Sequence, residues 1–171
     1  SVMIDKVDSS VVFFLLPEQE IGKPFHLYAD TGYPEKISRI IFHYESCKDD
    51  KEVMRLIKII QSKKIEAGLA IGPKTPVSKI KKFLDIADFI QVMTIHIGYA
   101  GQKFLPKQLT KVKQIRKWNK KIPISIDGGV RPGTARQCVK AGATRLCSGS
   151  YLWSAENIKK AFAELKKDAK I

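Results

Sequence analysis

The sequence predicts an α/β fold of the TIM type, in which parallel strands, each followed by a helix, close into a (β/α)₈ barrel. Two observations predict it. From residue 24 on, short runs that are apolar throughout alternate with amphipathic segments, a pattern typical of a parallel sheet covered by helices. Polar and glycine-rich residues follow these runs at the same end, where the active residues of such barrels lie.

The predicted strands are six apolar runs. They cover residues 24–29, 40–44, 67–71, 89–95, 122–126 and 145–148. These strands account for six of the eight β/α units of such a barrel, so we expect a barrel that is irregular at its start. Residues 1–16 are apolar enough to fill the gap as a strand. If they do not, we expect a homo-oligomer, a dimer whose interface covers the opening, because open strand edges must be paired or covered.

The predicted helices lie between and after these strands. They cover residues 50–63, 75–86, 106–118, 133–142 and 154–169. The second of them opens with Thr75 as N-cap and Pro76 in the first turn. The last opens with Ser154 as N-cap, and its apolar residues share one helical face. That face consists of Ile158, Ala161, Phe162 and Leu165.

Composition indicates an ordinary globular protein with a single domain over residues 1–171. Hydrophobic residues make up 44% and charged residues 28% of the chain. No apolar run approaches the roughly 20 residues of a membrane-spanning helix, and the run at 11–16 is too short for a signal peptide. The three cysteines have no metal-ligand spacing, so we interpret them as inert, reduced thiols of a cytoplasmic protein.

The net charge of +14 is the unusual bulk property. A basic surface attracts nucleic acids, anionic membranes or anionic metabolites. The lysines, however, recur at helix-surface spacing without interleaved aromatic residues, as between Lys107 and Lys121. We therefore expect a solvated lysine face and neither a nucleic-acid nor a membrane partner, and keep nucleic-acid binding as the weakest alternative.

The polar residues at the predicted strand ends form several ordered motifs. They read FHL around His26, IIFHYES at 40–46, AGLAIGPKTPV at 67–77, VMTIHIGYAGQKF at 92–104, ISIDGGV at 124–130 and AGATRLCSGS at 141–150. Together they resemble the ribulose-phosphate 3-epimerase family, from about residue 24 to 153. The resemblance implies a ribulose-phosphate-binding barrel, a sugar-phosphate substrate of the pentose phosphate pathway, and a divalent metal ion such as zinc, iron, manganese or cobalt.

The resemblance also implies a role for each matching residue. Asp127 would be a catalytic acid/base and a metal ligand, His26 a second metal ligand that also contacts substrate, and Met93 part of the substrate pocket. Backbone N–H groups after three strands would bind the phosphate, because glycine lets the main chain approach an anion. These groups belong to Gly98, Tyr99, Ala100 and Gly101, to Gly128 and Gly129, and to Gly149 and Ser150.

The chain departs from the family before His26. The family carries a His-x-Asp pair on its second strand, with two metal ligands and the other catalytic aspartate, yet only 25 residues precede His26. Either Asp5 or Asp8 substitutes, or the sequence lacks an end, or the protein is a degenerate homologue. The fold prediction is therefore a barrel that is incomplete or irregular over its first two β/α units.

The leading hypothesis is an isomerase that interconverts ribulose 5-phosphate and xylulose 5-phosphate (or a ketohexose phosphate) through an enediolate. The alternative is a non-catalytic sugar-phosphate binder or partner subunit. His26 could instead be a core histidine, and His96 could contact phosphate or face solvent. We interpret His43 as structural, and Trp118 and Trp153 as packing residues.

Overall fold

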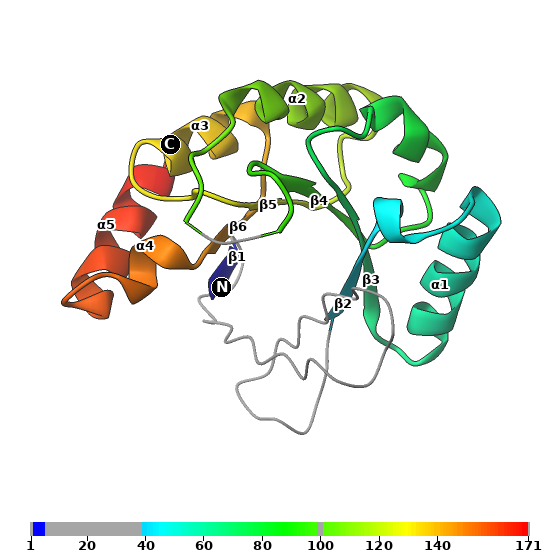
Figure 1. The fold of residues 1–171 in the computed structure, drawn as a ribbon, viewed down its shortest axis with the longest axis horizontal. Coiled ribbons are helices and arrows are strands. Elements are labelled where there is room, and N and C mark those ends of the chain that lie inside the picture. The colour runs from blue at the N-terminus through cyan, green and yellow to red at the C-terminus, as the bar shows by residue number, and fades with distance from the viewer. Residues whose placement is uncertain (1, 6–38, 99–100, 171) are drawn as a thin grey trace.

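The computed structural model describes residues 2–5, 39–98 and 101–170. Their strands form one six-stranded sheet, which Figure 1 shows with the helices along its outer side. The strands are β1 (Val2–Asp5), β2 (Arg39–His43), β3 (Glu66–Ile71), β4 (Phe89–Met93), β5 (Ile124–Asp127) and β6 (Arg145–Ser148). Five of the six predicted strands are confirmed, and the run at 24–29 lies outside the described residues.

The sheet order is β1-β6-β5-β4-β3-β2. Strands β2 to β6 are parallel to their neighbours, as expected of β/α units. Strand β1 is antiparallel to β6, with Val2 opposite Ser148 and Asp5 opposite Arg145. Among the described residues the sheet does not close beyond β1 and β2. The fold is therefore a (β/α)₈-type barrel that is irregular at its start, as predicted.

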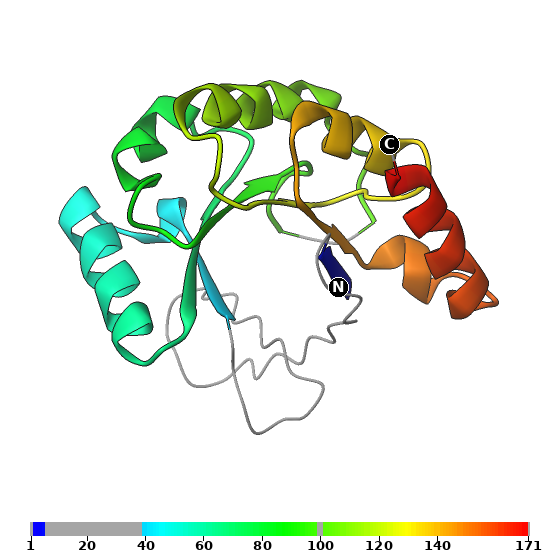
Figure 2. The same cartoon turned by 180° about the vertical axis from the view of Figure 1, so that it is seen from behind.

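The helices follow the strands and cover one face of the sheet (Figure 2). The described α-helices are α1 (Asp50–Ser62), α2 (Leu109–Trp118), α3 (Thr134–Ala141), α4 (Ser150–Trp153) and α5 (Ile158–Ala169). The described 3₁₀ helices are η1 (Tyr44–Ser46), η2 (Val77–Phe83) and η3 (Pro106–Gln108). None of the helices in the described part of the chain is long and apolar enough to cross a membrane.

Two predicted helix starts are wrong. The segment predicted at 75–86 is the 3₁₀ helix η2, whose N-cap is Pro76, because the Thr75 hydroxyl donates to the Glu45 carboxylate instead of capping. The helix predicted at 154–169 is α5, which begins at Ile158, because Ser154 is the C-cap of the preceding helix α4. Ser154 ends α4, with its N–H bonded to the Ser150 carbonyl, and Asn157 caps α5 by accepting from Lys160 N at 2.9 Å.

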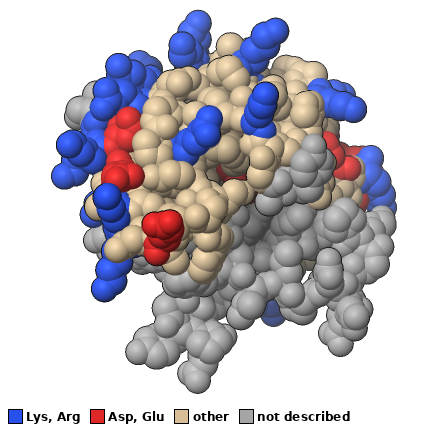
Figure 3. Space-filling view, turned by 60° about the vertical axis from the view of Figure 1, so that its left-hand side comes forward, with Lys and Arg blue, Asp and Glu red and all other residues tan. Residues whose placement is uncertain are grey.

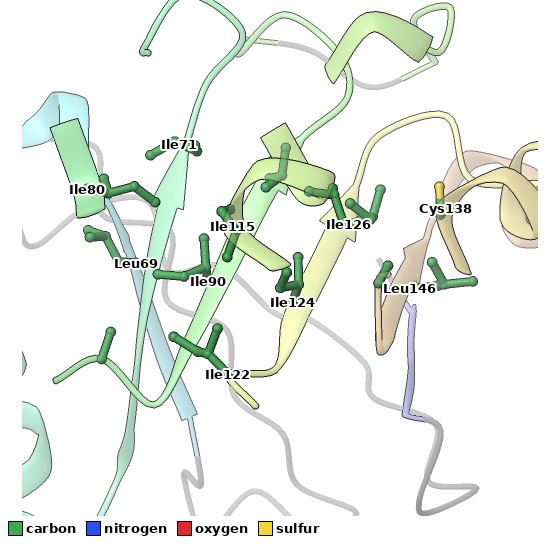
Figure 4. Close-up of a cluster of buried hydrophobic side chains, with 14 of the residues drawn as sticks. Leu69, Ile71, Ile80, Ile90, Ile115, Ile122, Ile124, Ile126, Cys138 and Leu146 are labelled. Carbon is green, nitrogen blue, oxygen red and sulfur yellow. The ribbon is translucent and has the colours of Figure 1, made fainter. Parts of the chain in front are cut away.

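The main core lies between the sheet and the helices, where Figure 4 shows its packing. Alternate strand residues such as Leu69, Ile90 and Ile124 point into it, and Ile80 and Ile115 meet them from η2 and α2. Ala161 and Leu165 of α5 are buried as predicted, whereas Ile158 is 47% exposed at the first turn of the helix.

The other strand face carries a separate and more polar set of side chains. Ile41, Ala70, Phe89 and Cys147 form a small apolar cluster there. Near the strand starts, Glu66 accepts from Arg39 Nε at 2.5 Å and from Arg145 at 3.3 Å, and Arg145 stacks over the Phe89 ring. This face is the inner face of the barrel. Its strand-start layer is an ion cluster, and its strand-end layer holds the predicted site.

Candidate functional site

The carboxyl ends of β4, β5 and β6 bring predicted site residues side by side. Met93 ends β4 and is paired in register with Asp127, which ends β5. Asp127 is paired on its other side with Cys147 of β6. Met93 and Cys147 are buried, whereas Asp127 is partly exposed, as a carboxylate that reaches a substrate must be.

A buried amide contacts the Asp127 carboxylate. Gln91 Nε2 donates to Asp127 Oδ2 at 3.4 Å and lies 3.6 Å from the sulfur of Met93. The Cys147 thiol lies 4.0 Å from Gln91 Oε1, so the oxygen end of the amide faces the thiol and the nitrogen end faces the carboxylate. Gln91 is fully buried, and its amide therefore has few alternative orientations. The amide N–H of Gln91 thus reaches the Asp127 carboxylate from inside the barrel.

The turn after Asp127 requires glycine at both of its positions. Gly128 and Gly129 have φ values of 115° and 68°, in the region that L side chains rarely adopt. A Cβ at position 128 would lie 2.5 Å from the Ile95 side chain, and one at 129 would lie 3.0 Å from the Phe104 backbone. The turn is thus packed closely against the loop that follows β4, and neither position has room for a larger side chain.

Thr94 joins the β4 loop to this turn. Its N–H donates to the Asp127 carbonyl at 2.8 Å, and its hydroxyl donates to the Gly128 carbonyl at 2.5 Å. The Leu105 N–H donates to the Thr94 carbonyl at 2.7 Å and closes the loop. Because Thr94 is completely buried, these bonds make the β4 loop and the β5 turn one unit.

The other predicted phosphate-binding glycines lie on either side of this turn. Gly98 and Gly101 have φ values of 142° and 79°, and a Cβ at either would meet nothing within 4 Å. Gly149 precedes α4, the short helix after β6, and Ser150 begins that helix. The Ser148 hydroxyl donates to the Val130 carbonyl at 2.8 Å and joins β6 to the β5 turn. Tyr99, Ala100 and His26 lie outside the described residues.

A second polar cluster lies at the ends of β2 and β3. Glu45 Oε1 accepts from the Gly72 N–H at 2.8 Å and from the Thr75 hydroxyl, and Glu45 Oε2 lies 3.5 Å from Nδ1 of the buried His43. Burial raises the pKa of the Glu45 carboxyl, but the hydrogen bonds from His43, Thr75 and Gly72 outweigh it and hold the pKa at about 2. Lys111 donates to the Gly72 carbonyl at 2.8 Å.

This low pKa predicts an acid-dependent stability. A carboxyl whose pKa falls from 4.5 to about 2 on folding stabilises the fold above pH 4.5, and that contribution is lost as the pH drops toward 2. After a discount for partial solvent exposure, we expect this carboxylate to contribute about 1–2 kcal/mol to the free energy of unfolding at neutral pH. Urea unfolding between pH 6 and pH 3 should show a smaller loss for Glu45→Gln than for wild type. An equal loss of unfolding free energy in the two proteins would show that Glu45 is not the source of the acid-dependent stability.

Sequence reasoning missed Gln91, Thr94 and the partners of Glu45. A signal for Gln91 was present, because it is the one polar residue inside the run FIQVM, two positions before Met93 on the same strand face. Glu45 stands two residues after His43 in its motif, but its bonds to Gly72 and Thr75 join residues 27 and 30 positions apart and have no local pattern.

The described residues alone do not fit a metal ion. Of the predicted ligands His26 and Asp127, only Asp127 is described, and the described part of the chain holds no group of three His, Cys, Asp or Glu side chains suited to a metal. Within the described residues, the Gln91 amide, the Met93 thioether and the Cys147 thiol lie beside Asp127. Burial raises the pKa of the Cys147 thiol far above its usual range, so it is not a thiolate ligand.

The remaining cysteines and tryptophans are described as well. Burial raises the pKa of Cys47 to about 11 and that of Cys138 to about 12, and all three cysteines are free, as predicted for inert thiols. Trp118 packs on the core under the Lys81 ammonium group, whereas Trp153 is 53% exposed and is not the packing residue predicted, because α4 buries only Leu152.

The described part of the surface in Figure 3 is basic, and its charges are spread out. Figure 3 shows Lys and Arg side chains spread widely over the described part of the face in view, with few acidic groups between them. A shallow depression on α2 is lined by Thr110, Lys113, Gln114, Lys117 and Trp118. It lies on a covering helix rather than at the strand ends, so we do not assign it to the candidate site.

Comparison with known proteins gives one consistent family. Residues 20–153 match the model of the ribulose-phosphate 3 epimerase family. A ribulose-phosphate 3-epimerase of Bacillus subtilis is 34% identical over 129 residues, which cover 72% of this chain and 58% of that protein. A ribulose-phosphate 3-epimerase of Chlamydia trachomatis is 28% identical over 162 residues, which cover 91% of this chain and 68% of that protein.

A solved structure resembles the fold. The crystal structure of a 3-hexulose-6-phosphate synthase superposes with a TM-score of 0.62 at 18% identity, covering 78% of this chain and 62% of the other. At this identity the likeness concerns the fold alone. The chain covers 58% and 68% of the length of these two epimerases and 41% of that of a chloroplastic ribulose-5-phosphate-3-epimerase of Arabidopsis thaliana.

Proposed function

Because the chain belongs to the ribulose-phosphate 3-epimerase family, we propose that it interconverts ribulose 5-phosphate and xylulose 5-phosphate, with Asp127 as acid/base. The observation that carries the proposal is the position of Asp127. Its partly exposed carboxylate ends a strand of the inner face, directly before two glycines whose φ values are 115° and 68°. The proposed base and the proposed anion-binding backbone are adjacent on the chain.

In the proposed reaction, Asp127 removes the proton from the carbon next to the ketone. The electron pair moves toward the carbonyl oxygen and gives an enediolate, and a proton returned to the opposite face inverts the carbon. Gln91 holds the carboxylate by its amide N–H at 3.4 Å. Backbone N–H groups of the segments at Gly98–Gly101, Gly128–Gly129 and Gly149–Ser150 would bind the phosphate and fix the distance from phosphate to reacting carbon.

Inversion needs a second acid/base on the other face of the enediolate. Asp5 and Asp8 are the predicted sources, and neither side chain belongs to the described residues. The divalent metal ion predicted at His26 and Asp127 stays a prediction, and no step above depends on it. The single-domain organisation, the homo-oligomer and the cytoplasmic location are likewise predictions.

The test is turnover by the purified protein. We expect the protein to interconvert ribulose 5-phosphate and xylulose 5-phosphate after divalent metal ions are added. Proton NMR measures the conversion. Tight binding of ribulose 5-phosphate without turnover would favour the alternative, a sugar-phosphate binder or partner subunit. If the protein neither binds nor turns over ribulose 5-phosphate, both the proposed function and the alternative are contradicted.

A further inference from the structure

Thr94 has no part in the reaction proposed above, yet it is bonded to two successive carbonyls of the glycine turn. It follows β4 directly and is completely buried. Its N–H donates to the Asp127 carbonyl at 2.8 Å, and its hydroxyl donates to the Gly128 carbonyl at 2.5 Å. Thr94 Oγ1 also lies 3.1 Å from the Asp127 carbonyl, but a hydroxyl has one proton and the shorter contact takes it. Both carbonyls therefore face the β4 side of the turn.

The direction of these carbonyls sets the direction of the N–H groups that follow them. No peptide bond in the described part of the chain is cis, and in a trans peptide the C=O and the next N–H point in opposite directions. Because the Gly128 carbonyl faces Thr94, the Gly129 N–H points away from β4. The sheet order places β5 between β4 and β6, so this N–H faces the β6 side of the turn.

The β6 side carries another backbone segment predicted to bind phosphate. Gly149 and Ser150 follow β6 directly, and the Ser148 hydroxyl ties the end of β6 to the turn by donating to the Val130 carbonyl at 2.8 Å. The Gly129 N–H meets no acceptor among the described residues. Gly129 is partly exposed, as a backbone group that binds a ligand must be.

The turn depends on its partners for this orientation. A glycine adopts φ values of either sign at little cost, so the peptide between Gly128 and Gly129 has no strong preference of its own. The hydroxyl of Thr94 orients this peptide. The next peptide is oriented separately, because the Gly129 carbonyl accepts from the Thr134 hydroxyl at 2.9 Å. The direction of the Gly129 N–H therefore depends on Thr94.

We propose that Thr94 is a positioning residue for the phosphate group of the substrate. By holding the Gly128 carbonyl, its hydroxyl turns the Gly129 N–H toward the segment at Gly149–Ser150, and the phosphate binds between them. The inference rests on the proposed function, because it names the side chain that orients a phosphate donor of that site. The ligand class is a phosphate monoester dianion, whose charge strengthens hydrogen bonds from backbone N–H groups.

Thr94→Val tests this with the least change in shape. Valine keeps the branched side chain and the backbone N–H but leaves the Gly128 carbonyl without its hydroxyl donor. Thr94→Ser keeps the hydroxyl and should bind phosphate like wild type. The matched control is Thr144→Val at the other end of β5, where the hydroxyl accepts from the Ile124 N–H at 3.0 Å and is not bonded to the turn.

Two measurements decide the inference. Calorimetry should show affinity for inorganic phosphate weakened about five- to tenfold in Thr94→Val, the usual size of one hydrogen bond, and within about twofold of wild type in Thr94→Ser and Thr144→Val. Proton–nitrogen NMR during a phosphate titration should show a downfield shift of the Gly129 amide proton in wild type and a smaller one in Thr94→Val. The Gly128 amide should differ less between the two proteins, because the Thr94 N–H still holds the Asp127 carbonyl.

Several results would overturn the inference. These are no binding of phosphate by wild type, an unshifted Gly129 amide in wild type saturated with phosphate, wild-type affinity in Thr94→Val, an equal loss in Thr144→Val, or no recovery in Thr94→Ser. The first two need no variant, so they decide the matter even where Thr94→Val does not fold. Failure of the proposed function is distinguishable, because phosphate would then bind with the pattern expected here while ribulose 5-phosphate is not converted.

Discussion

Replacing Asp127 by asparagine should slow proton exchange and epimerisation of ribulose 5-phosphate by about 10²-fold or more, the usual size of a general acid–base contribution. Asparagine keeps the shape of the side chain but cannot take a proton from carbon. Affinity for phosphate should change little, because backbone N–H groups of Gly128 and Gly129 would hold it. Proton NMR of ribulose 5-phosphate in deuterium oxide measures exchange and inversion together.

The same experiment shows whether the protein supplies one acid/base group or two. If Asp127 is the only acid/base group, wild type should exchange solvent deuterium into one epimer without inverting it, because one carboxylate serves one face. If a second acid is present, exchange and inversion should appear together. The control is Asp85→Asn, an exposed carboxylate that accepts from Asn119 at 3.0 Å and lies just before the start of β4. Exchange by Asp127→Asn at the wild-type rate would show that Asp127 is not the base.

Replacing Gly128 by alanine should destabilise the protein and disrupt the turn that follows Asp127. The φ of 115° costs about 1–3 kcal/mol for an L residue, and the contact of 2.5 Å with Ile95 adds about 1–3 kcal/mol of overpacking. We expect a loss of about 2–5 kcal/mol in the free energy of unfolding, measured in urea. Affinity for inorganic phosphate should fall as well.

Gly133→Ala is the matched control for this variant. Gly133 has a φ of 89°, but a Cβ there would meet nothing within 4 Å, so the substitution introduces backbone strain without a clash. It should cost about 1–3 kcal/mol and leave phosphate affinity unchanged. Equal losses in the two variants would mean that the packing of the turn against the β4 loop contributes nothing.

The parts of the fold that depend on local pattern could be predicted from the sequence. The runs that became β2 to β6 are apolar because the barrel covers both of their faces, so each is visible without its neighbours. The start of α5 could not be found this way, because Ser154 and Asn157 are both good N-cap residues. The backbone bond from Ser154 to the Ser150 carbonyl decides between them, and it exists only once α4 has formed.

The candidate site likewise has a part that could be predicted from the sequence and a part that could not. Asp127, Gly128 and Gly129 are adjacent in sequence, and their motif predicts a strand end and a tight turn, which the structure contains. The contact of Gln91 with Asp127 depends on strand register, and the contacts of Glu45 depend on the loop after the next strand. Such partners are separated by whole β/α units, so no spacing rule on a single sequence reveals them.

The pairing of β1 with β6 has a consequence for the order in which the chain assembles. Strands β2 to β6 each lie beside the strand that precedes or follows them along the chain, so they can add one after another during synthesis. Strand β1 is made before β2, yet its partner, Arg145–Ser148, is made only after β2 to β5. Closing so long a loop is slow, and β1 cannot pair with β6 until residues 145–148 have been made. A nascent chain halted before residue 145 would therefore carry that strand without a partner, as a target for chaperones or for a neighbouring copy.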